Sequence, residues 1–512
     1  MGRPNLLLIT TDQQHYRALG VHDPKLKTPN LDRLCREGTR FDRAYCPSPV
    51  CTPSRASIIT GQYPSHHGAW TIGVKLPEDV PTVGEALIEA GYSTALIGKA
   101  HFQPLATAPG SESIECQPVL RDLEFWRGFN QTWYGFEHLE LARNHADESH
   151  AGQHYAIWLE ERGLSDWRHY FQPLAGEISV KAPKATARGG YRRDERSWQL
   201  PADLHYTHWT GERTLAYLDA HARSEKPFFL WASFHDPHPP YVVSEPWASM
   251  YDPADMDVDQ VTQGEHSRNP PHFAKTQEEA PDFVDWHTPY MAHGCESHLY
   301  PVEELKKDKA VYYGMMSFLD AEVGRILDRL DELGLTEDTL VVFTTDHGHF
   351  LGQHGLIAKG PFHYEDMLRI PMIVRQPGTV PAGRISQDLQ SLVDLAPTFL
   401  DAAGMSVPGQ MQGVSQWANW RGGAAARDFV LCENRHNTVM PHVESYVNER
   451  YKITVYRQAD YGEIFDLVED PGEINNLWSD PAAAGLKTDL LLKMIQAVMR
   501  SEPTRMARIA GA

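Results

Sequence analysis

Long apolar runs are missing from this chain of 512 residues. No run approaches the roughly 18 to 20 consecutive apolar residues that a membrane-spanning helix needs. The apolar part of the opening segment, MGRPNLLLITTD, is too short for a signal peptide and runs directly into polar residues. We therefore expect a cytoplasmic protein that neither binds nor spans a membrane.

Cysteine and net positive charge are also lacking. The six cysteines, at positions 35, 46, 51, 116, 295 and 432, have no paired spacing, which argues against a disulfide framework and leaves no complete zinc motif. The formal net charge of -21 makes nucleic acid an unfavourable partner, because its phosphates would be repelled. An anionic substrate would require basic side chains gathered locally around it.

Four apolar runs each lead to a cluster of polar side chains. The runs cover 5–10, 92–98, 227–234 and 339–345, and the side chains that follow them include Asp12, Lys99, His101, His238, Asp346 and His347. Helical patterns at about 29–38, 81–90, 213–222 and 309–333 alternate with these runs. The alternation predicts an α/β fold with a large, mostly parallel sheet covered by helices on both faces. Because such sheets bind ligands at the carboxyl ends of their strands, we expect the four clusters to meet at one edge.

The domain organisation follows from where this alternation stops. Residues 1–425 are expected to form the catalytic α/β domain, with long insertions at about 103–205 and 243–305 that lack clear periodicity. Residues 426–512 are expected to form a smaller C-terminal α+β domain.

The stretch CTPSRASIITG, residues 51–61, combines a cysteine with signals for a helix start. Thr52 is a plausible N-cap, Pro53 suits the first helical position and Gly61 suits the C-terminal stop. Cys51 would then lie at the positive end of a helix, where an anion is stabilised, and Arg55 would lie one turn further on. The alternative for an isolated Cys-x-Pro is a buried cysteine that only packs.

Two groups of polar side chains suggest a metal and an anion. Asp12, Asp346 and His347 form a set suited to a divalent cation, although each alone could be a capping or turn residue. The basic side chains that could hold a tetrahedral oxyanion and protonate its leaving group are Lys99, His101, His238 and Lys359. A single surface lysine or core histidine would usually be structural, and we interpret His66 and His67 in that way.

Several motifs together resemble those of the type I sulfatases of the alkaline phosphatase superfamily. CTPSR is similar to the signature in which cysteine is oxidised to formylglycine, and the further matches include LLITTD, IGKAHF, FHDPHPPY, TTDHGHFLGQHGL and FDLVEDPGEINNL. The resemblance implies an alkaline phosphatase-like fold and a formylglycine-generating enzyme as the partner that modifies Cys51. It also implies a homo-oligomer and one divalent ion, with calcium favoured and manganese or zinc open, held by Asp12, Gln13, Cys51, Asp346 and His347.

The resemblance also implies a role for each catalytic residue. Hydrated formylglycine at position 51 would attack sulfur, while Arg55 and Lys99 hold the diol and the developing charge. His238 and Lys359 would bind the sulfate and assist departure of the alcohol. His101 would deprotonate the remaining hydroxyl, which expels sulfate and restores the aldehyde.

Two pairs depart from the commonest sulfatase pattern. Asp12-Gln13 replaces two adjacent aspartates and Asp346-His347 replaces an Asp-Asn pair, as in the subset that includes arylsulfatases, choline sulfatases and phosphonate monoester hydrolases. Lys99 with His101 favours hydrolysis of aryl or small alkyl sulfate monoesters to an alcohol or phenol and sulfate. Hydrolysis of phosphonate monoesters or phosphodiesters is the alternative. If Cys51 stays unmodified, the chain would be a catalytically silent module that binds metal and anions.

Overall fold

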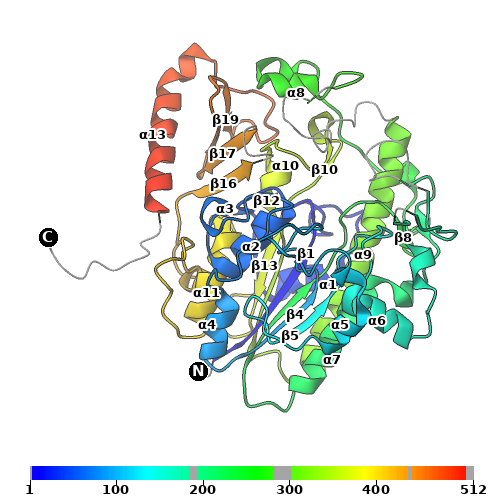
Figure 1. Cartoon of the computed structure of the whole chain (residues 1–512). Coiled ribbons are helices and arrows are strands. Elements are labelled where there is room, and N and C mark those ends of the chain that lie inside the picture. Colours follow the sequence, from blue (N-terminus) through cyan, green and yellow to red (C-terminus); the bar gives the residue numbers. More distant parts are fainter. Residues whose placement is uncertain are drawn as a thin grey trace.

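A mixed sheet forms the centre of the molecule (Figure 1). The computed structural model describes residues 3–174, 176–184, 193–281, 283, 301–435 and 441–502, so Cys295 lies outside the described residues. Among these residues the sheet has eight strands, in the spatial order β14 (Arg384–Ser386), β2 (Thr39–Phe41), β13 (Met372–Arg375), β9 (Thr339–Thr345), β1 (Asn5–Thr11), β7 (Phe228–Ser233), β4 (Ser93–Gly98) and β5 (His138–Leu141).

The sheet is mostly parallel, as the sequence predicts. β9, β1, β7, β4 and β5 run in one direction, and β13 is antiparallel to both of its neighbours. Thr11 pairs with Thr345 at the ends of β1 and β9, and Ser233 of β7 pairs with both Thr10 and Gly98. These four strands therefore end level with one another, and the segments that follow them emerge at one edge.

Helices cover both faces of the sheet because alternate strand residues point to opposite sides. Leu6 and Leu8 of β1 belong to a core with α2 (Cys51–Thr60), α4 (Val83–Glu89) and α11 (Leu395–Ala402). Leu7 and Ile9 belong to a second core with α1 (Pro29–Glu37), α7 (Tyr206–His221) and α9 (Val302–Glu332). The three-layer α/β fold expected from the sequence is confirmed (Figure 1).

Two features of the fold differ from the sequence prediction, the start of α9 (Val302–Glu332) and the structure of the range 103–205. α9 begins at Val302, before the predicted start near Lys309. Its first turn is mostly polar and has only Leu305 as a buried apolar residue, so the apolar periodicity that predicts a helix is weak there. The range 103–205, which we expected to be an insertion, contributes β5 to the central sheet as an edge strand. The same range holds α5 (Leu123–Gly128), α6 (Gln153–Glu161) and β6 (Ser197–Trp198).

Short elements complete the catalytic part of the chain. They are β3 (Ala44–Tyr45), α3 (Pro64–His67), β8 (Val243–Ser244), α8 (Pro271–Lys275), β10 (Phe350–Leu351), β11 (Ile357–Ala358), α10 (Glu365–Leu368), β12 (Arg369–Ile370), β15 (Gln390–Ser391) and α12 (Trp417–Trp420). None of the helices in the described ranges is long and apolar enough to cross a bilayer.

The C-terminal part is a smaller α+β unit. Four antiparallel strands, β16 (Val430–Arg435), β17 (His442–Val447), β18 (Tyr451–Tyr456) and β19 (Gly462–Asp466), form its sheet. The helix α13 (Ala484–Arg500) packs on this sheet through Leu490, Met494 and Ala497, and stands at the outer side of the molecule (Figure 1).

Candidate active site

Strand register brings two carboxylates together. Asp12 and Asp346 directly follow Thr11 and Thr345, which pair across β1 and β9. The backbone N–H of Gln13 donates to Asp346 Oδ1 at 3.0 Å, which links the two strand ends. Both aspartates are fully buried, so their charges need cationic partners close by.

Cys51 is the first residue of α2 and lies against these carboxylates. Its sulfur lies 3.2 Å from His347 Nε2, 3.1 Å from Lys359 Nζ and 3.7 Å from Asp12 Oδ1. Ser54, one turn later, donates from Oγ to the Asp346 carbonyl at 2.6 Å and so fixes the helix to the end of β9. The N-terminus of α2 therefore faces the strand ends, as expected.

The capping prediction at this helix was wrong. Val50 precedes the first helical residue, and no side chain caps the N-terminus. Thr52 lies inside the first turn, where its buried Oγ1 has no hydrogen-bond partner among the described residues. Gly61 ends the helix in the left-handed conformation, with φ of 64°, as predicted. The N–H groups of this first turn thus stay free of a side-chain cap beside the position of Cys51.

Arg55 lies close to Cys51 in sequence but bonds to other groups. Its Nε donates to Asp346 Oδ2 at 2.8 Å, and its Nη1 donates to the Lys99 carbonyl at 3.0 Å and to Ser233 Oγ at 2.8 Å. No hydrogen bond joins Arg55 to Cys51 in the described part of the chain, and Nη2 is buried there without a partner. Arg55 therefore holds α2 against the ends of β9, β4 and β7.

The electrostatic surroundings favour negative charge at position 51. Burial and the Asp12 carboxylate would raise the pKa of the Cys51 thiol, but the positive charges of Lys359, Lys99 and His347 outweigh them and lower it to about 6. Cys46, five residues earlier, gives the contrast, because burial raises its pKa well above the ordinary value. The site stabilises an anion that the rest of the core would not.

The donor set fits a divalent cation. Asp12, Cys51, Asp346 and His347 each offer one ligand atom, and these atoms all lie within 4.8 Å of one another. Gln13 adds a buried Oε1 that has no hydrogen-bond partner among the described residues, while its Nε2 lies 2.8 Å from His349 Nδ1. A buried carbonyl oxygen without a hydrogen-bond partner, on the residue that follows Asp12, is a ligand that a hard cation would satisfy.

Three basic side chains surround the same point. Lys99, which follows β4, contacts the Asp12 carboxylate through its ammonium group. Lys359 Nζ lies 3.0 Å from His238 Nε2 as well as 3.1 Å from Cys51. His238 follows β7, so the four strand-end clusters meet at one edge of the sheet, as predicted.

His101 is close to this group in sequence but is held separately. Its backbone N–H donates to Glu115 Oε1 at 3.0 Å, and its φ is 61°. Both ring nitrogens are buried without hydrogen-bond partners in the described ranges. Burial and the charges of Arg143 and Lys99 lower the pKa of the ring, so His101 is a neutral imidazole.

The sequence analysis missed His145. This side chain follows β5 and lies 2.7 Å from Lys99 Nζ and 3.3 Å from Asp12 Oδ2 through its Nε2. The rule that found the other clusters, a buried strand followed by polar residues, also fits HLEL followed by ARNH. This stretch lies in the range 103–205, whose lack of clear periodicity predicts an insertion and not a strand of the sheet.

His66 contacts the side chains of Ser65 and Gln412, and His67 contacts α2. His67 Nε2 is 3.1 Å from Ser57 Oγ and 3.2 Å from the Pro53 carbonyl, and burial lowers its pKa to about 3. These contacts hold His67 against α2, which agrees with a structural role for this residue.

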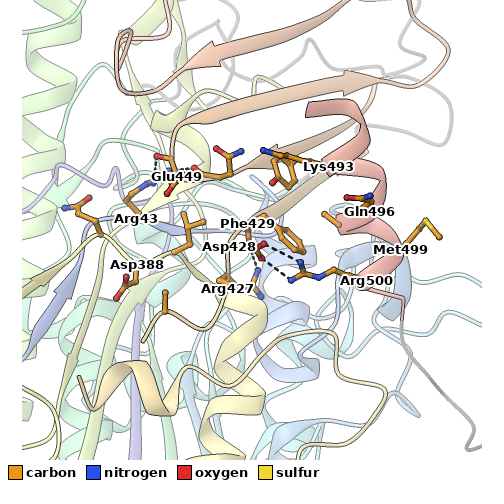
Figure 2. A pocket seen from close by; sticks show the side chains of 16 residues that line it. Arg43, Asp388, Arg427, Asp428, Phe429, Glu449, Lys493, Gln496, Met499 and Arg500 are labelled. Atoms are coloured by element: carbon orange, nitrogen blue, oxygen red, sulfur yellow. Dashed lines mark hydrogen bonds and ion pairs between the residues drawn. The ribbon is translucent and has the colours of Figure 1, made fainter. Parts of the chain in front are cut away.

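A separate groove of about 970 Å³ lies between α13 and the catalytic part (Figure 2). Arg500 pairs with Asp428 at 3.0 Å across it, and the Arg500 guanidinium lies 4.8 Å from the centre of the Phe429 ring. The groove contains none of the residues that form the cluster at the strand ends. The chemistry therefore belongs to the strand ends and not to this groove.

Comparison with known proteins gives consistent matches over nearly the whole chain. The Sulfatase family model matches residues 4–405, and the model of the N-sulphoglucosamine sulphohydrolase C-terminal region matches residues 352–500. The multifunctional alkaline phosphatase superfamily protein PehA of Trinickia caryophylli is 31% identical, over 97% of this chain and 95% of that protein. An arylsulfatase of Clostridium perfringens is 28% identical, over 93% of this chain and 90% of that protein. The crystal structure of phosphonate monoester hydrolase of Agrobacterium radiobacter has the same fold, with a TM-score of 0.78. The two sequences are 24% identical, and the match covers 98% of this chain and 97% of that one.

Proposed function

Because the chain belongs to the sulfatase family and is therefore a sulfuric ester hydrolase, we propose that it hydrolyses aryl or small alkyl sulfate monoesters with residue 51 as the nucleophile. The observation that carries the proposal is the position of Cys51. It begins α2 within 3.2 Å of both Lys359 and His347, at a point where negative charge is stabilised.

Residue 51 is proposed to act as formylglycine, whose hydrate supplies a hydroxyl nucleophile that a thiol lacks. Cys51 and the other residues of α2 are all buried. A formylglycine-generating enzyme would therefore have to reach this segment before the chain folds. We place this in the cytoplasm, where the five described cysteines, none of which forms a disulfide, would remain reduced.

The metal is proposed to be calcium, with manganese or zinc as alternatives. Two carboxylates, the Gln13 amide oxygen and one imidazole form a mostly oxygen donor set, which favours a hard cation, and the residues that would hold the ion are Asp12, Gln13, Asp346, His347 and residue 51. A bound divalent ion supplies positive charge that lowers the pKa of a hydroxyl group at residue 51.

The basic side chains have the positions needed to bind the sulfuryl group and protonate the leaving oxygen. Lys99 and Lys359 can donate to sulfuryl oxygens, whose charge their ammonium groups balance. His238 Nε2 lies 3.0 Å from Lys359 Nζ, so the Lys359 ammonium can supply, through His238, the proton that the alcohol oxygen takes up as its bond to sulfur breaks. Arg55 acts by holding Asp346 and α2, and His101 is the proposed base for the release of sulfate.

A second activity, hydrolysis of phosphonate monoesters, is favoured by the Gln13 and His347 pair. Against it, Lys99 and His101 supply the cationic and imidazole groups expected for sulfate esters. Both substrates are singly charged and tetrahedral at the central atom, but a phosphonate carries a carbon substituent where a sulfate ester has a third free oxygen. A matched pair of esters with one leaving group therefore separates the two activities.

The test is kcat/KM for 4-nitrophenyl sulfate and 4-nitrophenyl phenylphosphonate, which share one leaving group. The proposal predicts the higher value for the sulfate ester. A phosphonate value far above the sulfate value would reverse the assignment. Sedimentation analysis of the same preparation tests the expected homo-oligomer.

A further inference from the structure

His145 contacts two side chains of the proposed sulfate site, Lys99 and His238. It belongs to the segment after β5, which the proposed mechanism does not use. Its Nε2 lies 2.7 Å from Lys99 Nζ, and its ring stacks on the ring of His238 with centroids 3.7 Å apart and an angle of 15° between the planes. Lys99 and His238 come from different strands, β4 and β7, and His145 contacts both.

The partners of His145 determine which nitrogen carries its proton. Nε2 lies 2.7 Å from Lys99 Nζ and 3.3 Å from Asp12 Oδ2, and because an ammonium group can only donate, Nε2 accepts from Lys99, the nearer of the two. Nδ1 lies 2.9 Å from Glu148 Oε2, and a carboxylate only accepts, so Nδ1 is the protonated nitrogen. Glu148 therefore fixes both the tautomer and the orientation of the ring.

His238 shows the same arrangement on the other side of the stack. Its Nδ1 contacts the Pro239 carbonyl, and its Nε2 lies 3.0 Å from Lys359 Nζ. The two stacked imidazoles thus each accept from a different lysine, His145 from Lys99 and His238 from Lys359. Displacing one ring removes the surface on which the other rests.

We propose that His145, held by Glu148, is a positioning residue that fixes Lys99 by a hydrogen bond and His238 by ring stacking. The proposal rests on the function proposed above, because it assigns the two fixed groups to the sulfuryl and leaving-group oxygens. It adds a requirement for two side chains from the segment after β5, which no motif of the chain indicates.

Asp12, His145 and His238 also lie close enough together to hold a metal ion. Lys99 contacts two of these three side chains, Asp12 and His145, so its ammonium group already supplies a positive charge there. The proposal therefore assigns Lys99 as the resident cation and one metal ion to each chain. Binding of a second ion is the competing outcome.

The experiment compares three variants with matched controls in the full-length, metal-loaded protein. His145→Gln can keep an amide near the position of Nε2 and hence the contact with Lys99. His145→Asn can reach only towards Glu148, and Glu148→Gln keeps the acceptor but removes the charge. The controls are His169→Asn and Glu161→Gln, which change exposed residues of the same range.

Three quantities are measured for each variant: kcat and KM for a 4-nitrophenyl sulfate and an unactivated phenyl sulfate, the affinity for inorganic sulfate by calorimetry, and the metal content. We expect His145→Asn to lower kcat about 100-fold for the poor leaving group and less for the good one, because a misplaced catalytic group costs on that order. Sulfate affinity should fall about 10-fold, and His145→Gln should retain more activity than His145→Asn.

The other outcomes overturn the proposal. Equal losses on both esters together with a lower melting temperature would assign His145 a purely structural role. Loss of one of two bound metal ions would make it a metal ligand. If the wild-type protein turns over neither ester, the proposed function fails, but an unchanged sulfate affinity in His145→Asn would separately refute the positioning of Lys99.

Discussion

Arg55 Nε donates to Asp346 Oδ2 at 2.8 Å, and both side chains are fully buried. This ion pair joins the helix that carries residue 51 to the strand end that carries two of the proposed metal ligands, Asp346 and His347. Breaking a buried pair by removing one partner leaves a charge without compensation, which typically costs 3–5 kcal/mol.

Arg55→Ala is therefore expected to lower the free energy of unfolding by about 3–5 kcal/mol, measured by urea denaturation of the metal-free protein. Arg500→Ala is the matched control, because its pair with Asp428 is exposed and should contribute less than about 1 kcal/mol. Similar losses for the two variants would show that the buried pair does not fix α2.

Gln13→Ala should weaken metal binding without unfolding the protein. The buried Oε1 has no other partner in the described chain, so its removal takes away a ligand and leaves the aspartates in place. We expect the dissociation constant of calcium, measured by calorimetry, to rise about 10- to 100-fold. Gln496→Ala, an exposed change on α13, is the control, and an unchanged dissociation constant in Gln13→Ala would exclude Gln13 as a ligand.

In the unmodified, metal-free protein the Cys51 thiol should ionise near pH 6. Lysine and histidine charges lower the pKa of Cys51 to about 6, so its thiolate forms as pH rises from 5 to 7. Burial raises the pKa of Cys35 to about 12 and also raises that of Cys432 well above its usual value, so these thiols stay protonated. Thiolate absorbance should show this transition in the wild type and lose it in Cys51→Ala, and its persistence in the variant would place the ionising group elsewhere.

His354 should make the free energy of unfolding depend on pH in the alkaline range. Burial lowers its pKa, but Asp366 and Glu265, at 3.4 and 3.0 Å, outweigh burial and raise it to about 9. The protonated form therefore contributes stability that is fully present below pH 6.5 and lost as pH rises through about 9. The shift from 6.5 corresponds to roughly 3 kcal/mol.

The measurement is the difference in unfolding free energy between the wild type and His354→Gln from pH 6 to pH 10. We expect the difference to shrink over this range. His169→Gln, at an exposed position, should show no such trend. A constant difference would mean that His354 acts through packing against Tyr364 and not through its charge.

The sheet and most of the site could be predicted because each depends on short sequence signals. Asp12, Lys99, His238 and Asp346 all follow buried apolar runs, and parallel strands place such residues at one edge. The prediction of Thr52 as N-cap was wrong because α2 starts two residues earlier than predicted, at Cys51, where tertiary contacts of Cys51 and Ser54 replace a side-chain cap.

The pattern of a strand followed by polar residues fits His145, but sequence spacing does not show that this side chain meets Lys99. His145 lies 46 residues from Lys99, and the two meet only because β5 adds to the edge of the sheet beside β4. The sequence also could not show that Arg55 pairs with Asp346, because the two residues are distant in sequence. Local patterns predict the strand ends, and the sheet order decides which side chains meet there.

The most direct test of the account is the rate of aryl sulfate hydrolysis by protein from its native host, compared with Cys51→Ala from the same host. The account predicts formylglycine at position 51 and cysteine at position 46 by peptide mass spectrometry, measurable turnover in the wild type, and no turnover in a folded Cys51→Ala variant. Substantial sulfatase activity in that variant, or an active wild type with an unmodified Cys51 thiol, would contradict it.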